Sequence, residues 1–324
     1  MYAAAFGRLT IVSALGFATL GLAALCAALP ALAEGSVWAE LKPLIYQDRV
    51  LNDGRGLVQF QAPIRAEDQR HMEVSAQAAF KDGRKVKSLT FIIDENPAPV
   101  SARFRFGAEG RDKVDLGLTL RLDGPSEMHV VAEASDGQLY VVAQLIKASG
   151  AGVCAATPMG DQQEALASLG TMTLTDITEK ASGNANATQM KRRARLDIRH
   201  PSNSGLQRNQ ITLLYLPMRA VSAVEVKEGS EPLFQMEGSI SLSEDPRIDF
   251  SYQLNGASHL KAHMEDTSGA AFDKEYAIEP SSRFSGAAVI ASAAKQPRGH
   301  TSGSGLRRCA RNDGAGYPPL ALRT

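Results

Sequence analysis

A single cysteine lies in a segment of small residues near the middle of the chain. Residues 147–158 read Lys-Ala-Ser-Gly-Ala-Gly-Val-Cys-Ala-Ala-Thr-Pro, which places Cys154 directly after a strongly β-patterned run. Glycine frees the backbone and alanine adds almost no bulk, so such a segment can carry a cysteine sulfur towards a partner's active site. The alternative, from this segment alone, is a loop whose cysteine packs as a small hydrophobe.

A carrier cysteine needs access more than it needs a catalytic base, and no base lies near Cys154 in the sequence. A free thiol is only a few per cent thiolate near neutrality, so a partner enzyme would have to activate it. The expected covalent adduct on Cys154 would be the only group bound, and the sequence predicts no other cofactor.

An enzymatic alternative rests on His259 and His263, which lie four residues apart and share one face of a predicted strand, with Glu265 or Asp266 nearby. Spacing places no third ligand, so solvated histidines on a sheet face are favoured and no metal site is predicted. His71 and His200 are isolated, and His200 is expected to serve the turn before Pro201. The chain also lacks a phosphate loop, an HExxH motif, a serine-hydrolase elbow and a dinucleotide fingerprint, so we expect no catalysis by this chain alone.

The first 33 residues have the pattern of an export signal. Arg8 precedes an apolar run from Leu9 to Leu29, and the run ends in Ala31-Leu32-Ala33. We expect cleavage after Ala33 and a soluble mature protein in the periplasm. The alternative is that the apolar run is retained as a membrane anchor.

The positions of the cysteines and the balance of charges limit the kinds of partner that the sequence predicts. With Cys26 in the signal, Cys154 and Cys309 remain, and a disulfide between them is not expected because Cys309 lies in a tail without periodicity. The 35 basic residues balance 35 acidic ones, which gives no nucleic-acid footprint. The expected partners are therefore proteins or small solutes.

Alternating apolar patterns then dominate the chain and predict an all-β fold of two immunoglobulin-like antiparallel β-sandwich domains in tandem. A short helix from Ser36 to Tyr46, in which Pro43 is expected to shorten or kink the helix, precedes the strands, and a second short helix is expected over Asp161–Gly170. The strands are expected at 57–61, 72–80, 86–93, 100–106, 114–122, 128–134, 139–146, 194–198, 210–216, 223–226, 233–236, 248–253, 259–263 and 272–278.

The predicted boundaries follow these patterns. The first sandwich, with the arm that carries Cys154, occupies residues 34–160, and a linker rich in small polar residues occupies 161–190. The second sandwich spans 191–280, and disorder is expected over 281–324.

Several blocks of the sequence resemble a known family, and they come in family order. They are Ala62-Pro63-Ile64-Arg65-Ala66-Glu67-Asp68, Ile93-Asp94-Glu95-Asn96-Pro97-Ala98-Pro99, Val131-Ala132-Glu133-Ala134-Ser135-Asp136-Gly137, Lys147-Ala148 leading to Cys154, His200-Pro201 with Ser204-Gly205, Gly238-Ser239-Ile240-Ser241-Leu242-Ser243-Glu244-Asp245-Pro246, and Asp266-Thr267-Ser268-Gly269. Together they resemble the fused SoxYZ-like carrier proteins associated with quinoprotein alcohol dehydrogenases, over about Ser36 to Glu279.

The resemblance implies a covalent carrier cysteine at Cys154, on an arm that includes Gly150, Gly152, Val153 and Ala155. It also implies sulfane or thiosulfonate adducts, pairing of the SoxY-like with the SoxZ-like domain, and periplasmic partner oxidoreductases from sulfur oxidation or alcohol oxidation. The arm departs from the family pattern at Val153, because the family has paired glycines before its cysteine and valine is stiffer. The alternative function is a scaffold for a periplasmic dehydrogenase, without covalent cargo.

Overall fold

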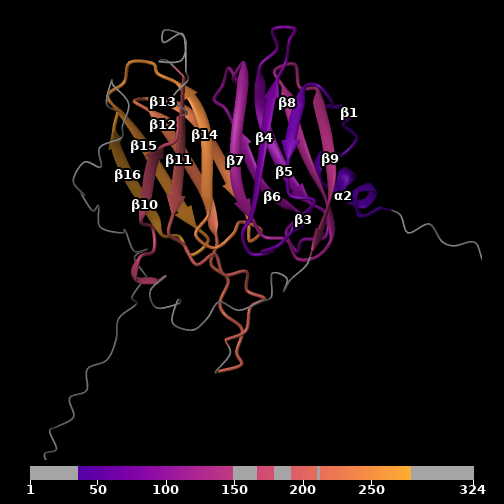
Figure 1. The fold of residues 1–324 in the computed structure, drawn as a ribbon, viewed down its shortest axis with the longest axis vertical. Coiled ribbons are helices and arrows are strands. Elements are labelled where there is room, and N and C mark those ends of the chain that lie inside the picture. The colour runs from indigo at the N-terminus through magenta and orange to yellow at the C-terminus, as the bar shows by residue number, and fades with distance from the viewer. Residues whose placement is uncertain (1–35, 149–165, 179–190, 210–211, 279–324) are drawn as a thin grey trace, which may run out of the picture.

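The computed structural model describes residues 36–148, 166–178, 191–209 and 212–278. One helix and sixteen strands are named within them, and most of the strands belong to two sheets (Figure 1). Their bounds are α2 Val37–Tyr46, β1 Leu51–Asp53, β2 Val58–Gln61, β3 Arg65–Ala66, β4 Met72–Ala79, β5 Val86–Ile93, β6 Val100–Arg105, β7 Lys113–Leu120, β8 Ser126–Ala134, β9 Leu139–Ala148, β10 Met172–Asp176, β11 Lys191–Ile198, β12 Val221–Glu228, β13 Glu231–Gly238, β14 Arg247–Gln253, β15 His259–Asp266 and β16 Ala271–Ala277. In these residues no helix is long and apolar enough to cross a membrane.

The all-β prediction is confirmed, and each half of the chain is an antiparallel immunoglobulin-like sandwich. The two halves lie side by side in Figure 1, with β1–β9 in indigo to magenta and β10–β16 in rose to orange. Strand β4 shows why the sequence folds this way, since its residues alternate between buried and more exposed positions along all eight residues.

Both sheets run continuously across the two halves. The larger sheet has the strand order β1-β9-β8-β5-β6-β13-β12-β15-β16, and the smaller has β10-β11-β14-β7-β4-β2. In the larger sheet Ala102–Arg105 of β6 pair with Gln235–Gly238 of β13, and in the smaller one Leu116–Leu118 of β7 pair with Ile248–Phe250 of β14. We call this double junction the seam.

The hydrophobic core follows the sheets across the seam. Four buried aromatic rings lie in edge contact one after another, with centroids 6.0 Å, 5.5 Å and 5.2 Å apart, in the order Phe91, Phe104, Phe234 and Phe250. The first two come from the first half and the last two from the second. A single core cluster therefore contains residues of both halves, so their packing is shared.

Helix α2 confirms the first predicted helix and lies beside β9 in Figure 1, where its Tyr46 packs on residues of β5, β8 and β9 in the larger sheet. Pro43 lies inside this helix, which still continues to Tyr46. Of the helix expected over Asp161–Gly170, Leu166 and Ala167 are helical, Ser168–Gly170 form a turn, and the rest lies outside the described residues.

Two sequence-based expectations differ from the structure. Residues 161–190 were expected to be a linker, but β10 lies within them and pairs with β11 at the edge of the smaller sheet. The strand expected at Gln210–Leu216 is wrong in its described part, because that chain forms a projecting loop whose backbone bonds are made internally. Within the loop, Asn209 N donates to Leu214 O at 2.9 Å, and Leu216 N donates to Gln207 O at 2.8 Å.

Candidate functional site

Cys154 and the arm residues Gly150, Gly152, Val153 and Ala155 lie outside the described residues. The structure does describe Ala148, six residues before Cys154, where β9 ends. Covalent geometry alone limits the distance between the Cα atoms of Ala148 and Cys154 to about 20 Å. The end of β9 is therefore the fixed point from which the position of Cys154 is bounded.

A short parallel strand holds this end of β9. Arg65 and Ala66 of β3 pair with Lys147 and Ala148, and the Lys147 amide donates to the carbonyl of Ile64 at 2.9 Å. A few residues earlier, the side chain of Gln144 donates to the carbonyl of residue 62 at 2.9 Å. Residues 62–66, which belong to the block 62–68 quoted from the sequence, thus pair with and hydrogen-bond to the last residues before the cysteine segment.

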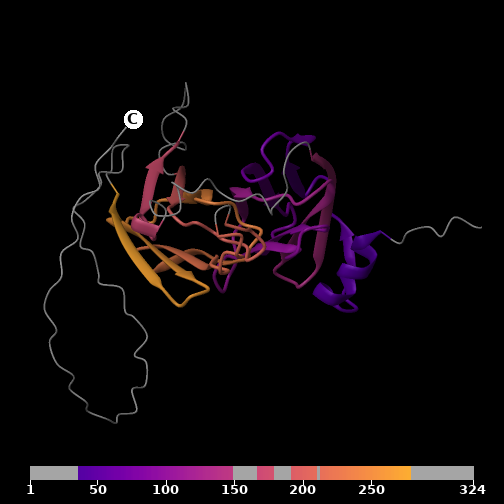
Figure 2. The same cartoon turned by 90° about the horizontal axis from the view of Figure 1, so that it is seen from below.

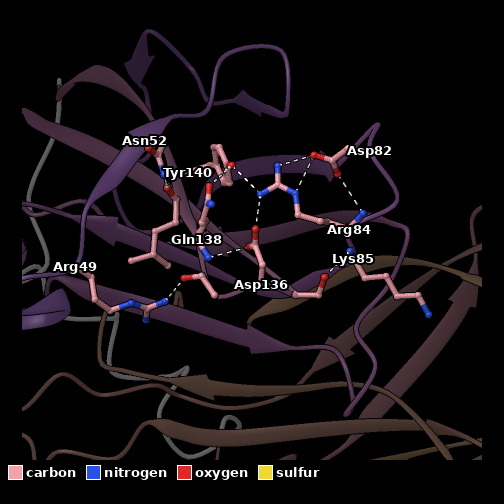
Figure 3. Close-up of polar contacts among 11 residues, drawn as sticks. Arg49, Asn52, Asp82, Arg84, Lys85, Asp136, Gln138 and Tyr140 are labelled. Atoms are coloured by element: carbon pink, nitrogen blue, oxygen red, sulfur yellow. Dashed lines mark hydrogen bonds and ion pairs between the residues drawn. The ribbon is translucent and has the colours of Figure 1, made fainter.

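A polar network fixes the other end of β9 (Figure 3). Arg84 donates to Asp82 at 2.9 Å, to Asp136 at 2.9 Å and to the hydroxyl of Tyr140 at 2.8 Å. The Tyr140 hydroxyl donates in turn to Gln138 at 2.8 Å. Because these residues come from the turns before β5 and before β9, Arg84 ties the two turns together, and β9 is held at both ends.

Asn96 joins the two halves at the seam. Its amide nitrogen donates to the carbonyl of Arg121 at 2.8 Å and to the hydroxyl of Ser241 at 3.0 Å, while its oxygen accepts from the amide of Asp123 at 2.9 Å. The Ser241 hydroxyl donates to the carbonyl of Ala98 at 2.7 Å. Two of the blocks quoted from the sequence, 93–99 and 238–246, are therefore bonded to each other in the interior.

A buried guanidinium crosses the same seam. Arg121 is 2% exposed and donates to the carbonyls of Pro201 and Ser202 in the second half. Burial lowers the pKa of Arg121 to about 10. Backbone carbonyls accept its hydrogen bonds and the carboxylate of Glu244 favours its charged form, so the contact depends on the exact course of the turn at Pro201 and Ser202.

His200 serves that turn. Its Nδ1 accepts a hydrogen bond from the amide of Ser202 at 2.9 Å, and its Nε2 lies 3.6 Å from the carboxylate of Asp266. Burial lowers the pKa of His200 to about 4, an effect that the nearby Asp266 opposes. The imidazole is therefore neutral at pH 7, with its proton on Nε2, and acts as a structural acceptor.

The sequence analysis missed one cluster of ionisable side chains. Within the described residues, Asp94, Glu127 and His129 form the one group of side chains whose ligand atoms lie close enough to share a metal ion. However, His129 Nδ1 already lies 3.0 Å from Asp94, and the indole of Trp38 stacks on the imidazole with centroids 3.8 Å apart. These contacts give the histidine a structural role in docking α2 on the sheet.

Only tertiary placement brings this cluster together. Asp94 follows β5, His129 lies in β8, and Trp38 comes from the helix before the first strand. The sequence signal available was Asp94 within the block 93–99, together with the only tryptophan of the chain.

Models of two known families match the two halves of the chain. The model for the sulfur oxidation protein SoxY matches residues 43–154, and the model for the sulphur oxidation protein SoxZ matches residues 182–277. The chain joins a SoxY domain to a SoxZ domain. The seam, with Asn96 and Arg121 on one side, is therefore an intramolecular pairing of SoxY with SoxZ.

Among solved structures, one similar chain is the sulfur carrier protein SoxY from Chlorobium limicola f thiosulfatophilum, at 19% identity and a TM-score of 0.30. That alignment covers 35% of this chain and 96% of the other. Among curated proteins, none matches this sequence.

The two histidines weighed as metal ligands lie in the SoxZ half, on β15. Both ring nitrogens of His263 lie against carboxylates, Nδ1 at 2.8 Å from Asp273 and Nε2 at 3.1 Å from Glu265. His259 instead lies 3.2 Å from Glu275. The structure gives each histidine carboxylate neighbours of its own and does not bring the two together as ligands.

Proposed function

We propose that this protein carries a sulfur intermediate bound covalently to Cys154 and presents it to partner enzymes of sulfur oxidation. The observation that carries the proposal is the extent of the SoxY match, which ends at residue 154, the cysteine itself. The segment before it contains only serine, glycine, alanine and valine after Ala148, so its sequence adds little bulk around the sulfur.

The described structure supports a role for β9 as the anchor of the arm that carries Cys154. Strand β9 is held at its start by Arg84 and at its end by β3, so the approach to Cys154 begins from a fixed point. The SoxZ half is joined to the SoxY half through both sheets, which makes the two domains one support. Movement of the cargo then depends on the residues after Ala148.

Loading proceeds by formation of a sulfur–sulfur bond. Taking thiosulfate as the cargo, the Sγ of Cys154 bonds to the outer sulfur of thiosulfate, the thiol loses its proton, and two electrons pass to the partner oxidoreductase. The product is a cysteine S-thiosulfonate, and the Cβ–Sγ bond of the cysteine stays intact. Because the oxidant belongs to the partner, the chain itself acts as carrier and not as enzyme.

The proposal includes export and a further partner enzyme. The N-terminal pattern suits cleavage after Ala33 and a periplasmic location, and the resemblance to fused carriers suggests a quinoprotein alcohol dehydrogenase as a further partner. Intact mass and N-terminal sequencing of the exported protein test the first point. A mature protein that begins before Glu34 contradicts it.

The decisive experiment is the intact mass of the protein purified from its native compartment without reductant, followed by peptide mapping of the Cys154 segment. We expect a reductant-labile mass increase on Cys154, lost in Cys154→Ser and retained in the matched control Cys309→Ser. Cys154→Ser should change the free energy of unfolding by less than about 0.5 kcal/mol. Full function of Cys154→Ser in the cell would instead support a scaffold without covalent cargo.

A further inference from the structure

Exposed apolar side chains gather on the projecting loop. Residues 203–209 and 212–219 form this loop, which extends beyond the strand ends in Figure 1. It holds five of the ten large hydrophobic side chains that are exposed in the described part of the chain. They are Leu206 at 39%, Leu213 at 61%, Leu214 at 68%, Tyr215 at 65% and Met218 at 55%. Exposed apolar side chains that cluster in this way mark a surface that binds another molecule.

The loop keeps its shape through contacts of its own. The amide of Asn209 donates to the carbonyl of Leu214 at 2.9 Å, and Arg208 donates from Nε and Nη2 to the carbonyl of Leu213 at 3.2 Å and 3.1 Å. The guanidinium of Arg208 also lies 5.7 Å from the ring centroid of Tyr215. Leu213 has a φ of 59°, a conformation that is unfavourable for leucine. A folded loop with defined contacts therefore holds the two leucines in solvent.

The loop begins at the end of the molecule where β9 stops, and a series of hydrogen bonds connects the two places. Ser126 of β8 pairs with β9 two residues before Ala148, and its hydroxyl accepts from the amide of residue 95 at 3.1 Å. The next residue, Asn96, donates to the carbonyl of Arg121, whose guanidinium donates to the carbonyl of Ser202. Ser202 directly precedes the loop, so the start of the cysteine segment and the base of the loop lie at one end of the sheets (Figure 1).

The first described residues after Cys154 lie beside the same loop. The amide of Gly170 donates to the carbonyl of Arg199 at 2.8 Å, and the amide of Arg199 donates to the carbonyl of Thr171 at 2.8 Å. Arg199 precedes the loop by only a few residues. In Figure 2, which views the molecule from below, the loop lies between the two halves. The described chain on either side of the cysteine segment therefore flanks the base of the loop, and a molecule that engages Cys154 from this end meets the loop.

This placement selects among the possible occupants of the exposed apolar surface. A membrane or a second copy of the chain seated on the loop would cover the end of the molecule from which Cys154 is presented. A second copy would also bring like charges together, because residues 203–219 contain Arg208 and Arg219 and no acidic residue. An enzyme that acts on Cys154, in contrast, must approach this end.

We propose that the projecting loop docks into an apolar groove of the oxidoreductase that loads Cys154, beside the entrance to the active site of that enzyme. The inference rests on the carrier role proposed above, and it adds the surface by which the SoxZ half takes part in loading. Leu213 and Leu214 enter the groove, and Tyr215 borders them. Because Arg121 ties the base of the loop to the SoxY half, docking of the loop orients both halves, while the residues after Ala148 bring the sulfur to the enzyme.

The test follows loading of Cys154 after a pulse of thiosulfate, by intact mass and peptide mapping, in native cells where each variant replaces the wild type. Leu213→Ser/Leu214→Ser should load at least about tenfold more slowly, because truncating the apolar anchors of an interface weakens binding by such factors. Both side chains are more than 60% exposed, so the melting temperature should not change. The matched control Leu44→Ser/Val50→Ser removes two aliphatic side chains, 80% and 73% exposed, outside the loop and should load at the wild-type rate.

Chemical loading separates docking from the reactivity of the thiol. The thiolate of Cys154 attacks an inner sulfur of tetrathionate, the central sulfur–sulfur bond breaks and thiosulfate leaves, so the same S-thiosulfonate forms without an enzyme. The purified wild type and Leu213→Ser/Leu214→Ser should react with tetrathionate at equal rates. A slower reaction of the variant would mean that the loop acts on the thiol itself and would overturn the docking role.

Three other results would overturn the inference. Loading of Leu213→Ser/Leu214→Ser at the wild-type rate would refute the docking role and leave the carrier role intact, whereas absence of an adduct on the wild type as well would refute both. A dimer in analytical ultracentrifugation that is lost in the loop variant would assign the loop to a second copy of the chain. Binding to phosphatidylglycerol vesicles that is lost in the same variant would assign it to a membrane.

Discussion

Lowering the pH should destabilise this protein through one imidazole, that of His200. The side chain is fully buried, and its pKa falls from 6.5 in the unfolded chain to about 4 in the folded protein. Between these values the unfolded state binds more protons than the folded state, so the free energy of unfolding falls as the pH drops below 6.5.

The magnitude follows from the two pKa values. At pH 5 the unfolded histidine is almost fully protonated and the folded one is mostly neutral, which costs about 2 kcal/mol relative to pH 8. The limiting cost, reached below pH 4, is about 3 kcal/mol. Such a loss is a large fraction of the stability of an ordinary domain.

The assay is urea unfolding followed by far-UV circular dichroism at pH 8, 7, 6 and 5, on the wild type and on His200→Asn. Asparagine keeps an acceptor for the amide of Ser202 but does not titrate. Subtracting the free energy of unfolding of His200→Asn from that of the wild type at each pH removes the contribution of the carboxylates. Between pH 8 and pH 5 the free energy of unfolding of the wild type should fall by about 2 kcal/mol relative to that of the variant. A difference that stays constant, or that grows in favour of the wild type at low pH, refutes the reasoning, since the latter would mean that Asp266 holds a charged imidazole.

Three further results are expected from urea or calorimetric unfolding. Asn96→Ala should cost about 1–3 kcal/mol, because it leaves buried groups on both sides of the seam without partners; a cost near zero would mean that water replaces the amide. Phe234→Ala should cost about 3–5 kcal/mol and lower one common transition for both halves, whereas two separate transitions would contradict the shared core. Gly170→Ala should lower the free energy of unfolding by about 1–3 kcal/mol more than Gly256→Ala does. Both glycines have a positive φ, but only at Gly170 would an added Cβ meet a neighbour, which is Phe272 at 2.0 Å. Equal losses in the two variants would contradict this.

The strands could be predicted where side chains alternate over enough residues. Strand β4, Met72–Ala79, places a core residue at every second position, so period 2 identifies both the strand and its buried face. Strand β10 was missed because only Met172 and Leu174 of its five residues face the core, and two apolar positions beside a polar linker do not define a period.

The error at Gln210–Leu216 has a different cause. Isoleucine, leucine and tyrosine in that stretch suggested a strand, but Leu213, Leu214 and Tyr215 are each more than 60% exposed, and Leu213 has a φ of 59°. Composition predicts strand propensity but not the presence of a neighbouring strand to pair with.

The candidate site was predictable only in part. Residues 62–66 were visible as part of a sequence block, but their pairing with the end of β9 was not. The contacts of Asn96 with Ser241 and of Asp94 with His129 join positions distant along the chain, and no local pattern encodes which distant partners meet. The role of Cys154 stays a prediction, since it rests on sequence and on the extent of the SoxY match.

Pairing across the seam also lowers the tendency of this protein to aggregate through open strand edges. Two separate sandwiches would each end in open strand edges, but pairing β6 with β13 and β7 with β14 places four of those strands in sheet interiors. The ends that remain in the described sheets are short, with three residues in β1, four in β2 and five in β10, or charged, as in β16, where Asp273, Lys274 and Glu275 follow one another. Joining the domains in one chain thus keeps the edges most prone to self-association covered from the moment the halves fold, without a search for a second subunit.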